Sequence, residues 1–402
     1  RSPLPNLYEE KRRMIRELPA GENRRGRIGI PMGLNMYELL PFWHTLFSEL
    51  GFSLVFPDDA ESEKLADMAA ETIPSESVCH PAKIGRARIA SLAQAGAHVV
   101  FAPRFERGTR CPVSCLYTDV LAVNTTGVRI ANPTLRSIRP HHMASRPHEL
   151  AALCDEVNSW APRDGQVAQD EFNTAFFRAL AEQDAYENEL GQAVQAAFSW
   201  AEDDPQRRIA LLVGRPYHND PALLHGIDRE LAKLGFAVLP SYAISSPRAA
   251  SDAPPRPKLD EDIIRPESTT PVAATGATRY GGSAAQLPLW KSAKHLVRLV
   301  ETFARNPQVE IVALRSFGCL YDAVSADEAR DVASALGRPF TELKIDDIAD
   351  TAHIRIRLRT LAYTTHARNA AVADTRAEAN APAEFAIHQA PAGLAGGITP
   401  DL

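Results

Sequence analysis

The sequence lacks several features that would place it in a specialised class of protein. It has no run of about 18 apolar residues, so no transmembrane helix is expected. It has no long run of one charge sign and a net charge of −6, so neither nucleic acid nor an anionic membrane surface is an expected partner. Its five cysteines include no CxxC pair, so a zinc ribbon is a poor match. An odd number of cysteines in a long chain argues against a disulfide framework, which favours a reducing compartment and a cytoplasmic protein.

The remaining composition is that of an ordinary globular protein. Apolar residues make up 45% and charged residues 23% of 402 residues, which is enough chain for about two or three domains. Residues 1–26 are too charged for a signal peptide, and we expect them to form an N-terminal extension.

Two series of short apolar runs alternate with amphipathic segments. The first series of predicted strands covers 27–33, 52–59 and 97–105. The second series covers 207–218, 236–241, 309–319 and 339–346. Alternation of strand and helix predicts parallel sheets with helical crossovers. We therefore predict an α/β fold with two Rossmann-like lobes with parallel sheets, joined by helices.

The predicted domains follow from these two series. The first α/β lobe spans 27–146, a helical connector spans 147–204, and the second lobe spans 205–362. Residues 246–284 are rich in Pro, Ala, Ser and Thr, which predicts a disordered insertion in the second lobe. Residues 363–402 are rich in alanine and lose apolar periodicity, so we expect a flexible C-terminal tail.

Four of the five cysteines fall where a predicted strand leads into a helix. They are Cys79, Cys111, Cys115 and Cys319. Open α/β sheets bind ligands beyond the carboxyl ends of their strands, and the positive end of a helix dipole favours a thiolate. Thiolates gathered from distant loops suit an iron–sulfur cluster, whereas a single cysteine more often packs in a core. Cys154 lies in the middle of a predicted helix, and we expect it in the core.

Several long blocks of the sequence resemble the acyl-CoA dehydratase activase-related proteins. The blocks are IGIPMGLNMYELLPFWHTLFSELGF, ETIPSESVCHPAKIGRARI, VGRPYHNDPALLHGI, LRSFGCLYDAVSADEARDV and LKIDDIADTAHIRIRLRTL. Within that family they look like the module that follows the ATPase domains of large fused chains. That module is similar to the 2-hydroxyacyl-CoA dehydratase component, whose Rossmann-like lobes hold a [4Fe–4S] cluster through cysteines. The resemblance covers residues 26–362, with the insertion outside it.

The resemblance implies an iron–sulfur redox module of an acyl-CoA dehydratase/activase system. Such a module passes electrons or binds a CoA-thioester substrate at a [4Fe–4S] cluster. By motif, Cys79, Cys111 and Cys319 fall where cluster thiolates are expected, and Cys115 is either a fourth ligand or a bystander. The implied partners are ATPase activase domains and a dehydratase-like component. This chain has no glycine-rich phosphate loop, so we do not expect it to be the ATPase itself.

The block GRPYHNDP places three more polar residues after a predicted strand. Arg215, Tyr217 and His218 are candidate cofactor-binding residues. Arg215 is suited to a CoA phosphate or a carboxylate, and His218 to a hydrogen bond with a cluster sulfide or to proton transfer. The alternative is a loop whose polar groups satisfy its own backbone.

Two other functions remain open from the sequence. The chain is suited to be a non-catalytic partner-binding domain of a larger activase, in which the cysteines are structural. It is equally suited to be a zinc- or CoA-binding α/β domain without redox activity.

Overall fold

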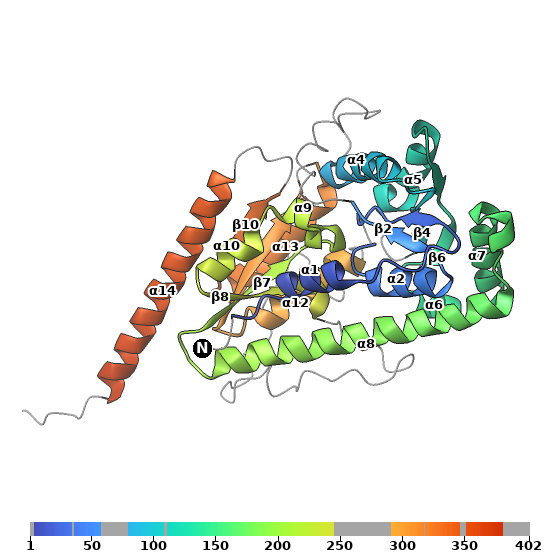
Figure 1. The fold of residues 1–402 in the computed structure, drawn as a ribbon. Helices are drawn as coiled ribbons and strands as arrows, with labels where there is room; N and C mark the ends of the chain where they lie inside the picture. The colour runs from blue at the N-terminus through green and yellow to red at the C-terminus, as the bar shows by residue number, and fades with distance from the viewer. Residues whose placement is uncertain are drawn as a thin grey trace, which may run out of the picture. The chain divides into compact units, whose positions relative to one another are not determined.

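The structure is a computed structural model, in which the placement of seven segments is described. They are residues 4–33, 36–57, 79–107, 111–244, 291–316, 318–345 and 351–380. The predicted insertion 246–284 lies outside them, as do residues 381–402 of the predicted tail. By its contacts the chain divides into two units, Arg1–Arg359 and Thr360–Leu402, and the three sheets described below belong to the first unit (Figure 1).

The first lobe is built on a parallel sheet with the strand order β2-β1-β3-β5. These strands are β1 (Arg27–Gly29), β2 (Ser53–Val55), β3 (Val99–Phe101) and β5 (Arg129–Ala131). The helices of this part of the chain are α2 (Leu40–Glu49), α4 (His80–Gln94), α5 (Pro112–Asn124) and α6 (His141–Ala144). Its core gathers large aromatic side chains, with Trp43 packed against Phe42, Phe47 and Phe101.

One predicted strand of this lobe is divided in the structure. The run 97–105 forms β3 and then β4 (Arg104–Arg107), which pairs with β6 (Thr134–Ser137) in a separate two-stranded sheet. Pro103 lies between β3 and β4. Because proline has no N–H to donate to a sheet ladder, it separates the two strands.

The second lobe has a parallel sheet with the strand order β10-β9-β7-β8. Its strands are β7 (Arg208–Val213), β8 (Phe236–Pro240), β9 (Val309–Arg315) and β10 (Phe340–Lys344). Its helical elements are η3 (Pro216–Asn219), α9 (Pro221–Leu224), α10 (Ile227–Lys233), η4 (Ser241–Ala243), α12 (Lys291–Phe303) and α13 (Leu320–Ala335). The strands β7 and β8 are buried almost throughout, which explains their continuous apolar sequence.

In the described part of the chain, helices before and between the two lobes complete the fold. They are α1 (Leu7–Glu17), α7 (Pro147–Trp160) and α8 (Gln169–Glu202), with the short η2 (Arg163–Gly165) between the last two. The first half of α8 contributes Phe172 and Phe176 to the core of the first lobe. Its second half contributes Val194 and Phe198 to the core of the second lobe. One helix therefore belongs to both cores.

The fold class predicted from the sequence is confirmed, since the chain is a mixed α/β protein with parallel sheets whose strands are connected by helices. The expected flexible tail differs from the structure over residues 363–380, which continue α14 (Ala352–Asn380). Alanine is abundant in this segment and is the strongest helix former, so a helix forms there without a regular apolar stripe. None of the described helices is both long enough and apolar enough to cross a membrane.

Candidate functional site

Three of the predicted ligand cysteines occupy the same kind of position. Cys79, Cys111 and Cys319 are the N-cap residues of α4, α5 and α13, and each has an extended backbone conformation. The first turn of a helix carries N–H groups without intrahelical partners and a partial positive charge. A sulfur at this position is favoured in its thiolate form, which is the form that binds metals.

The three sulfurs come from both lobes, and the sulfur of Cys79 interacts with each of the other two. Burial raises the pKa of the Cys79 thiol to about 11, and repulsion from the sulfurs of Cys111 and Cys319 adds to this rise. All three cysteine side chains are half-buried. The structure therefore brings Cys79 within electrostatic range of Cys111 in its own lobe and of Cys319 in the second lobe.

Asp322, on the first turn of α13, organises the surroundings of Cys319. Its carboxylate accepts hydrogen bonds from Arg215 Nε at 2.9 Å and from the Tyr217 hydroxyl at 3.3 Å. It also accepts one from the backbone N–H of Ser316 at 3.2 Å. Arg215 Nη2 and the Tyr217 hydroxyl in turn lie 3.8 Å and 4.0 Å from the sulfur of Cys319. Two of the three candidate cofactor-binding residues thus contact a candidate ligand.

The charges in this network are balanced. Burial alone would lower the pKa of Arg215, but the neighbouring Tyr217 and Asp322 raise it above its usual value, so the guanidinium stays charged. The Arg215–Asp322 pair is nearly inaccessible to solvent, with side-chain exposures of 7% and 4%. Burial raises the pKa of Cys319, and the negative charge of Asp322 contributes to the rise. In the absence of a bound cation, Cys319 is therefore held as a neutral thiol.

His218 is placed behind Arg215. Its Nδ1 accepts a hydrogen bond from the backbone N–H of Arg215 at 3.0 Å, and its Nε2 lies 3.1 Å from the hydroxyl of Ser316. Because Nδ1 is the acceptor, the network assigns the ring proton to Nε2, which donates to Ser316. Burial lowers the pKa of His218 to about 4, so the ring is neutral at physiological pH. A side chain at Gly214 would meet this ring, since its Cβ would lie 2.5 Å from Nδ1.

A buried ion pair joins the two lobes beside this network. Arg88 of α4 binds both carboxylate oxygens of Asp220, with Nη1–Oδ2 and Nη2–Oδ1 distances of 2.5 Å and 2.7 Å. Tyr217 also packs against Ile84 of the same helix. The helix that begins at Cys79 is thereby held against the loop that carries Arg215 and Tyr217.

The sequence analysis did not identify Asp322, Ser316, Arg88 or Asp220. Two of them could have been noticed in the sequence. Asp322 lies three residues after Cys319, at a predicted helix start, and Asp220 lies within the block GRPYHNDP. Acidic residues are favoured in the first turn of a helix, so Asp322 reads as an ordinary capping residue. Only the packing of the lobes shows its contacts with Arg215 and Tyr217.

The other two cysteines lie apart from this description. Cys115 belongs to α5, one turn after Cys111, and its side chain lies outside the described part of the structure. Cys154 is confirmed as a core residue, since it is 2% exposed and its thiol donates to the carbonyl of Val167 at 3.7 Å.

The side chains at this site determine whether it is suited to bind a metal ion or cluster. Among the described residues, no group of three or more His, Cys, Asp and Glu side chains is arranged to hold a metal ion as it stands. The donor set nevertheless suits a thiophilic group, because three helix N-termini present one sulfur each. Metal binding would displace the thiol protons and draw the side chains together.

Comparison with protein families adds an independent finding. The family described as the CoA enzyme activase uncharacterised domain matches residues 27–244, which is more than half of the chain. The matched range includes Cys79, Cys111 and the loop from Arg215 to His218, and it ends before Cys319. A comparison with curated proteins gave no match. The match confirms the family resemblance seen in the sequence: the chain belongs to the family of the CoA enzyme activase uncharacterised domain.

Proposed function

We propose that this chain is the redox module of a CoA enzyme activase system, and that Cys79, Cys111 and Cys319 hold a [4Fe–4S] cluster. The observation that carries the proposal is the arrangement of the three cysteines. Each is the N-cap of a different helix, and the sulfurs interact across two lobes. Distant loops that each deliver one thiol to a helix N-terminus are what a cluster ligand set requires.

When bound, an iron–sulfur cluster exchanges single electrons at a potential set by its ligands and by hydrogen bonds to its sulfurs. The residues of this chain support such a group in two ways. Each ligand sulfur lies at a helix N-terminus, whose partial positive charge would offset part of the negative charge of a bound thiolate–metal group. Arg215 and Tyr217 present an N–H and an O–H toward the sulfur of Cys319, which withdraws charge from that sulfur.

The number of ligands determines what the module does. Three protein thiolates leave one iron without a protein ligand, which suits binding of a CoA-thioester substrate. A fourth thiolate from Cys115 would instead suit a module that only passes electrons. In either case ATPase activase domains and a dehydratase-like component are the partners that we propose.

The test is anaerobic purification of the full chain, followed by reconstitution with iron and sulfide. We expect iron and acid-labile sulfide to be bound together with the broad visible absorbance of a cluster. Cys79→Ser, Cys111→Ser and Cys319→Ser are each expected to lose most of the iron, because serine is a harder and far less acidic ligand. Cys154→Ser is the matched control and is expected to keep it.

Two outcomes would contradict the proposal. Stoichiometric zinc without bound iron in the wild-type protein would identify a zinc domain. Full iron content in Cys79→Ser would remove this residue from the ligand set. Cys115→Ser, measured in the same way, distinguishes three ligands from four.

A further inference from the structure

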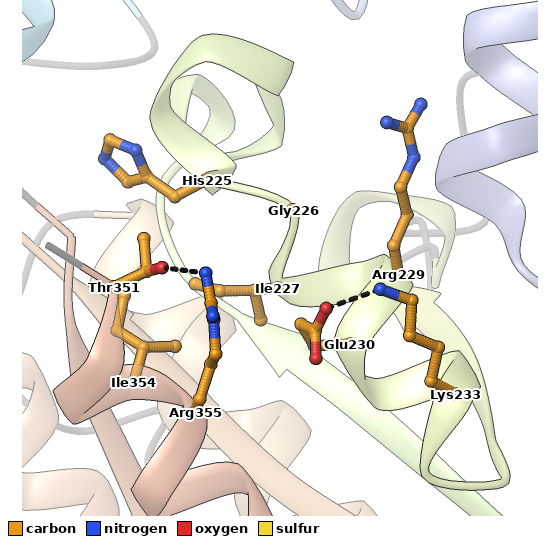
Figure 2. A pocket seen from close by; sticks show the side chains of 9 residues that line it. All are labelled: His225, Gly226, Ile227, Arg229, Glu230, Lys233, Thr351, Ile354 and Arg355. Carbon is orange, nitrogen blue, oxygen red and sulfur yellow. Dashed lines mark hydrogen bonds and ion pairs between the residues drawn. The ribbon is translucent and has the colours of Figure 1, made fainter.

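A pocket of about 120 Å³ lies between α10 and the first turn of α14, within the first unit of the chain (Figure 2). Its polar lining consists of His225, Arg229, Glu230, Lys233, Thr351 and Arg355. Figure 2 shows Thr351 and Arg355 on one side of Ile227, and Glu230 and Lys233 on the other. The volume exceeds what one water molecule requires, so the pocket has room for a small polar group.

This lining carries an excess of one positive charge, that of Arg355, although the chain has a net charge of −6. Two cations, Lys233 and Arg355, stand against the single carboxylate of Glu230, whereas Arg229 is paired with Glu9, with Nε 3.3 Å from the carboxylate. Their field acts on that carboxylate, because the hydrogen bond from Lys233 and the charge of Arg355 lower the pKa of Glu230. A net excess of positive charge in a hollow favours an anionic ligand.

The cations are held in place but keep donors to spare. Arg355 Nη2 donates to the hydroxyl of Thr351 at 3.0 Å, and within the described residues Arg355 forms no ion pair with a carboxylate. Lys233 Nζ lies 2.7 Å from Glu230, which uses one of its three donors. The guanidinium of Arg355 has five donors in a planar fork, an arrangement that matches phosphate oxygens.

We propose that this pocket binds a phosphate group of the kind carried by CoA or by a nucleotide. The donors of Arg355 and the remaining donors of Lys233 around one small hollow, with the hydroxyl of Thr351 beside them, fit the three or four oxygens of a phosphate better than the two of a carboxylate. Arg215, which the sequence suggested for this task, is instead neutralised by Asp322 in the buried network.

The pocket adjoins the candidate cysteine site through one ring contact. His225, on the pocket wall, stacks on His80 with ring centroids 6.5 Å apart, and His80 directly follows Cys79. A ligand anchored by its phosphate would therefore lie beside the start of α4. The inference does not depend on the cluster, because it concerns residues outside the proposed ligand set.

Calorimetric titration of the full chain, purified without metal, tests the inference with pyrophosphate, ADP, CoA and dephospho-CoA as probes. We expect binding that weakens with added salt, and a loss of about tenfold or more in affinity in Arg355→Gln, since a hydrogen bond to a charged group is removed. Lys233→Gln is a second variant in the same pocket. Arg357→Gln is the matched control on the same helix, because Arg357 donates to the carbonyl of Glu342 and does not line the pocket.

The probes distinguish the two sources of phosphate. Tighter binding of CoA than of ADP and of dephospho-CoA would identify the ribose phosphate of CoA as the bound group. Similar binding of CoA and ADP would identify a diphosphate. The inference is overturned if none of the probes binds, or if Arg355→Gln and Arg357→Gln bind them equally well. Circular dichroism of each variant excludes a loss of fold as the cause.

Discussion

Lys11 of α1 is a buried ammonium group enclosed by aromatic rings. It is 2% exposed, and its Nζ lies 4.8 Å from the ring centres of Tyr37 and Tyr186 and 5.2 Å from that of Tyr242. The faces of these rings attract a cation, which compensates in part for the lost hydration. Burial nevertheless lowers the pKa of Lys11 to about 7, although the nearby Glu38 acts in the opposite direction. Lys11 is therefore close to half-protonated at neutral pH.

This lowered pKa predicts how stability depends on pH. Between about pH 7 and about pH 10, the unfolded chain binds a proton at Lys11 that the folded chain has released, so the free energy of unfolding rises with pH in this window. Lys11→Met removes this contribution. We expect the free energy of unfolding of the wild-type protein to rise by up to about 1.4 kcal/mol per pH unit relative to that of Lys11→Met, measured by urea unfolding between about pH 7 and about pH 9.

Lys233→Met, a substitution of an exposed lysine, is the control, and its free energy of unfolding should change with pH as that of the wild type does. Parallel pH profiles of the wild type and Lys11→Met would show that Lys11 keeps an ordinary pKa.

At the candidate site, each of the three predicted ligand cysteines lies at the start of a helix. Cys79, Cys111 and Cys319 precede α4, α5 and α13, and Pro81 and Pro112 lie in the first turns of α4 and α5. Proline is well tolerated there, because the first N–H groups of a helix have no intrahelical partner. Each cysteine thus occupies a position where serine, threonine or aspartate would be the usual residue. Its presence in place of a better capping residue is what favours a ligand role over a purely structural one.

Substitution of these N-cap cysteines by serine separates the two roles by stability alone. Serine is a better N-cap than cysteine, so Cys79→Ser and Cys111→Ser should leave the free energy of unfolding of the metal-free protein unchanged or raise it by up to about 1 kcal/mol. Cys154→Ser instead buries a hydroxyl in the core and should cost about 1–3 kcal/mol. Chemical denaturation of the metal-free proteins provides the comparison. A loss in Cys79→Ser as large as that in Cys154→Ser would indicate that Cys79 is a packing residue.

At the scale of the whole molecule, most of the strands and their order along the chain followed from the sequence because their signal is local, whereas β5 and β6 of the first lobe were not predicted. The run that forms β7 is apolar from Ile209 to Val213, and the run that forms β9 is apolar from Ile311 to Leu314, a pattern that a buried strand or helix explains. The break at Pro103 and the extension of α14 were missed, because one residue redirects a strand and alanine forms a helix without an apolar stripe.

The candidate site was predictable only in part, for a related reason. A cysteine at the start of a helix can be recognised from the neighbouring residues alone. Cys79, Cys111 and Cys319 do lie at helix starts in the structure. The partners of Arg88 and Lys11 depend on how segments far apart in the chain pack together. Arg88 is separated from Asp220 by 132 positions, and no local pattern specifies such a pair.

The Arg88–Asp220 pair should be a main energetic link between the lobes. Both side chains are nearly inaccessible, at 1% and 2% exposure, and Arg88 also donates to the carbonyl of Met32 at 3.1 Å. Removing one partner leaves a buried charge without its counter-ion, so Arg88→Met and Asp220→Asn should each cost about 3–5 kcal/mol. The double variant should lose clearly less free energy of unfolding than the sum of the two single losses, because the second substitution removes the group that the first left unpaired.

Urea unfolding, followed by tryptophan fluorescence, measures the free energy of unfolding of the wild type and the three variants. The exposed Arg178–Glu49 pair provides a control cycle, for which a coupling below about 1 kcal/mol is expected. A coupling energy for Arg88–Asp220 as small as that of the control would mean that packing alone, through helices such as α8, holds the two lobes together.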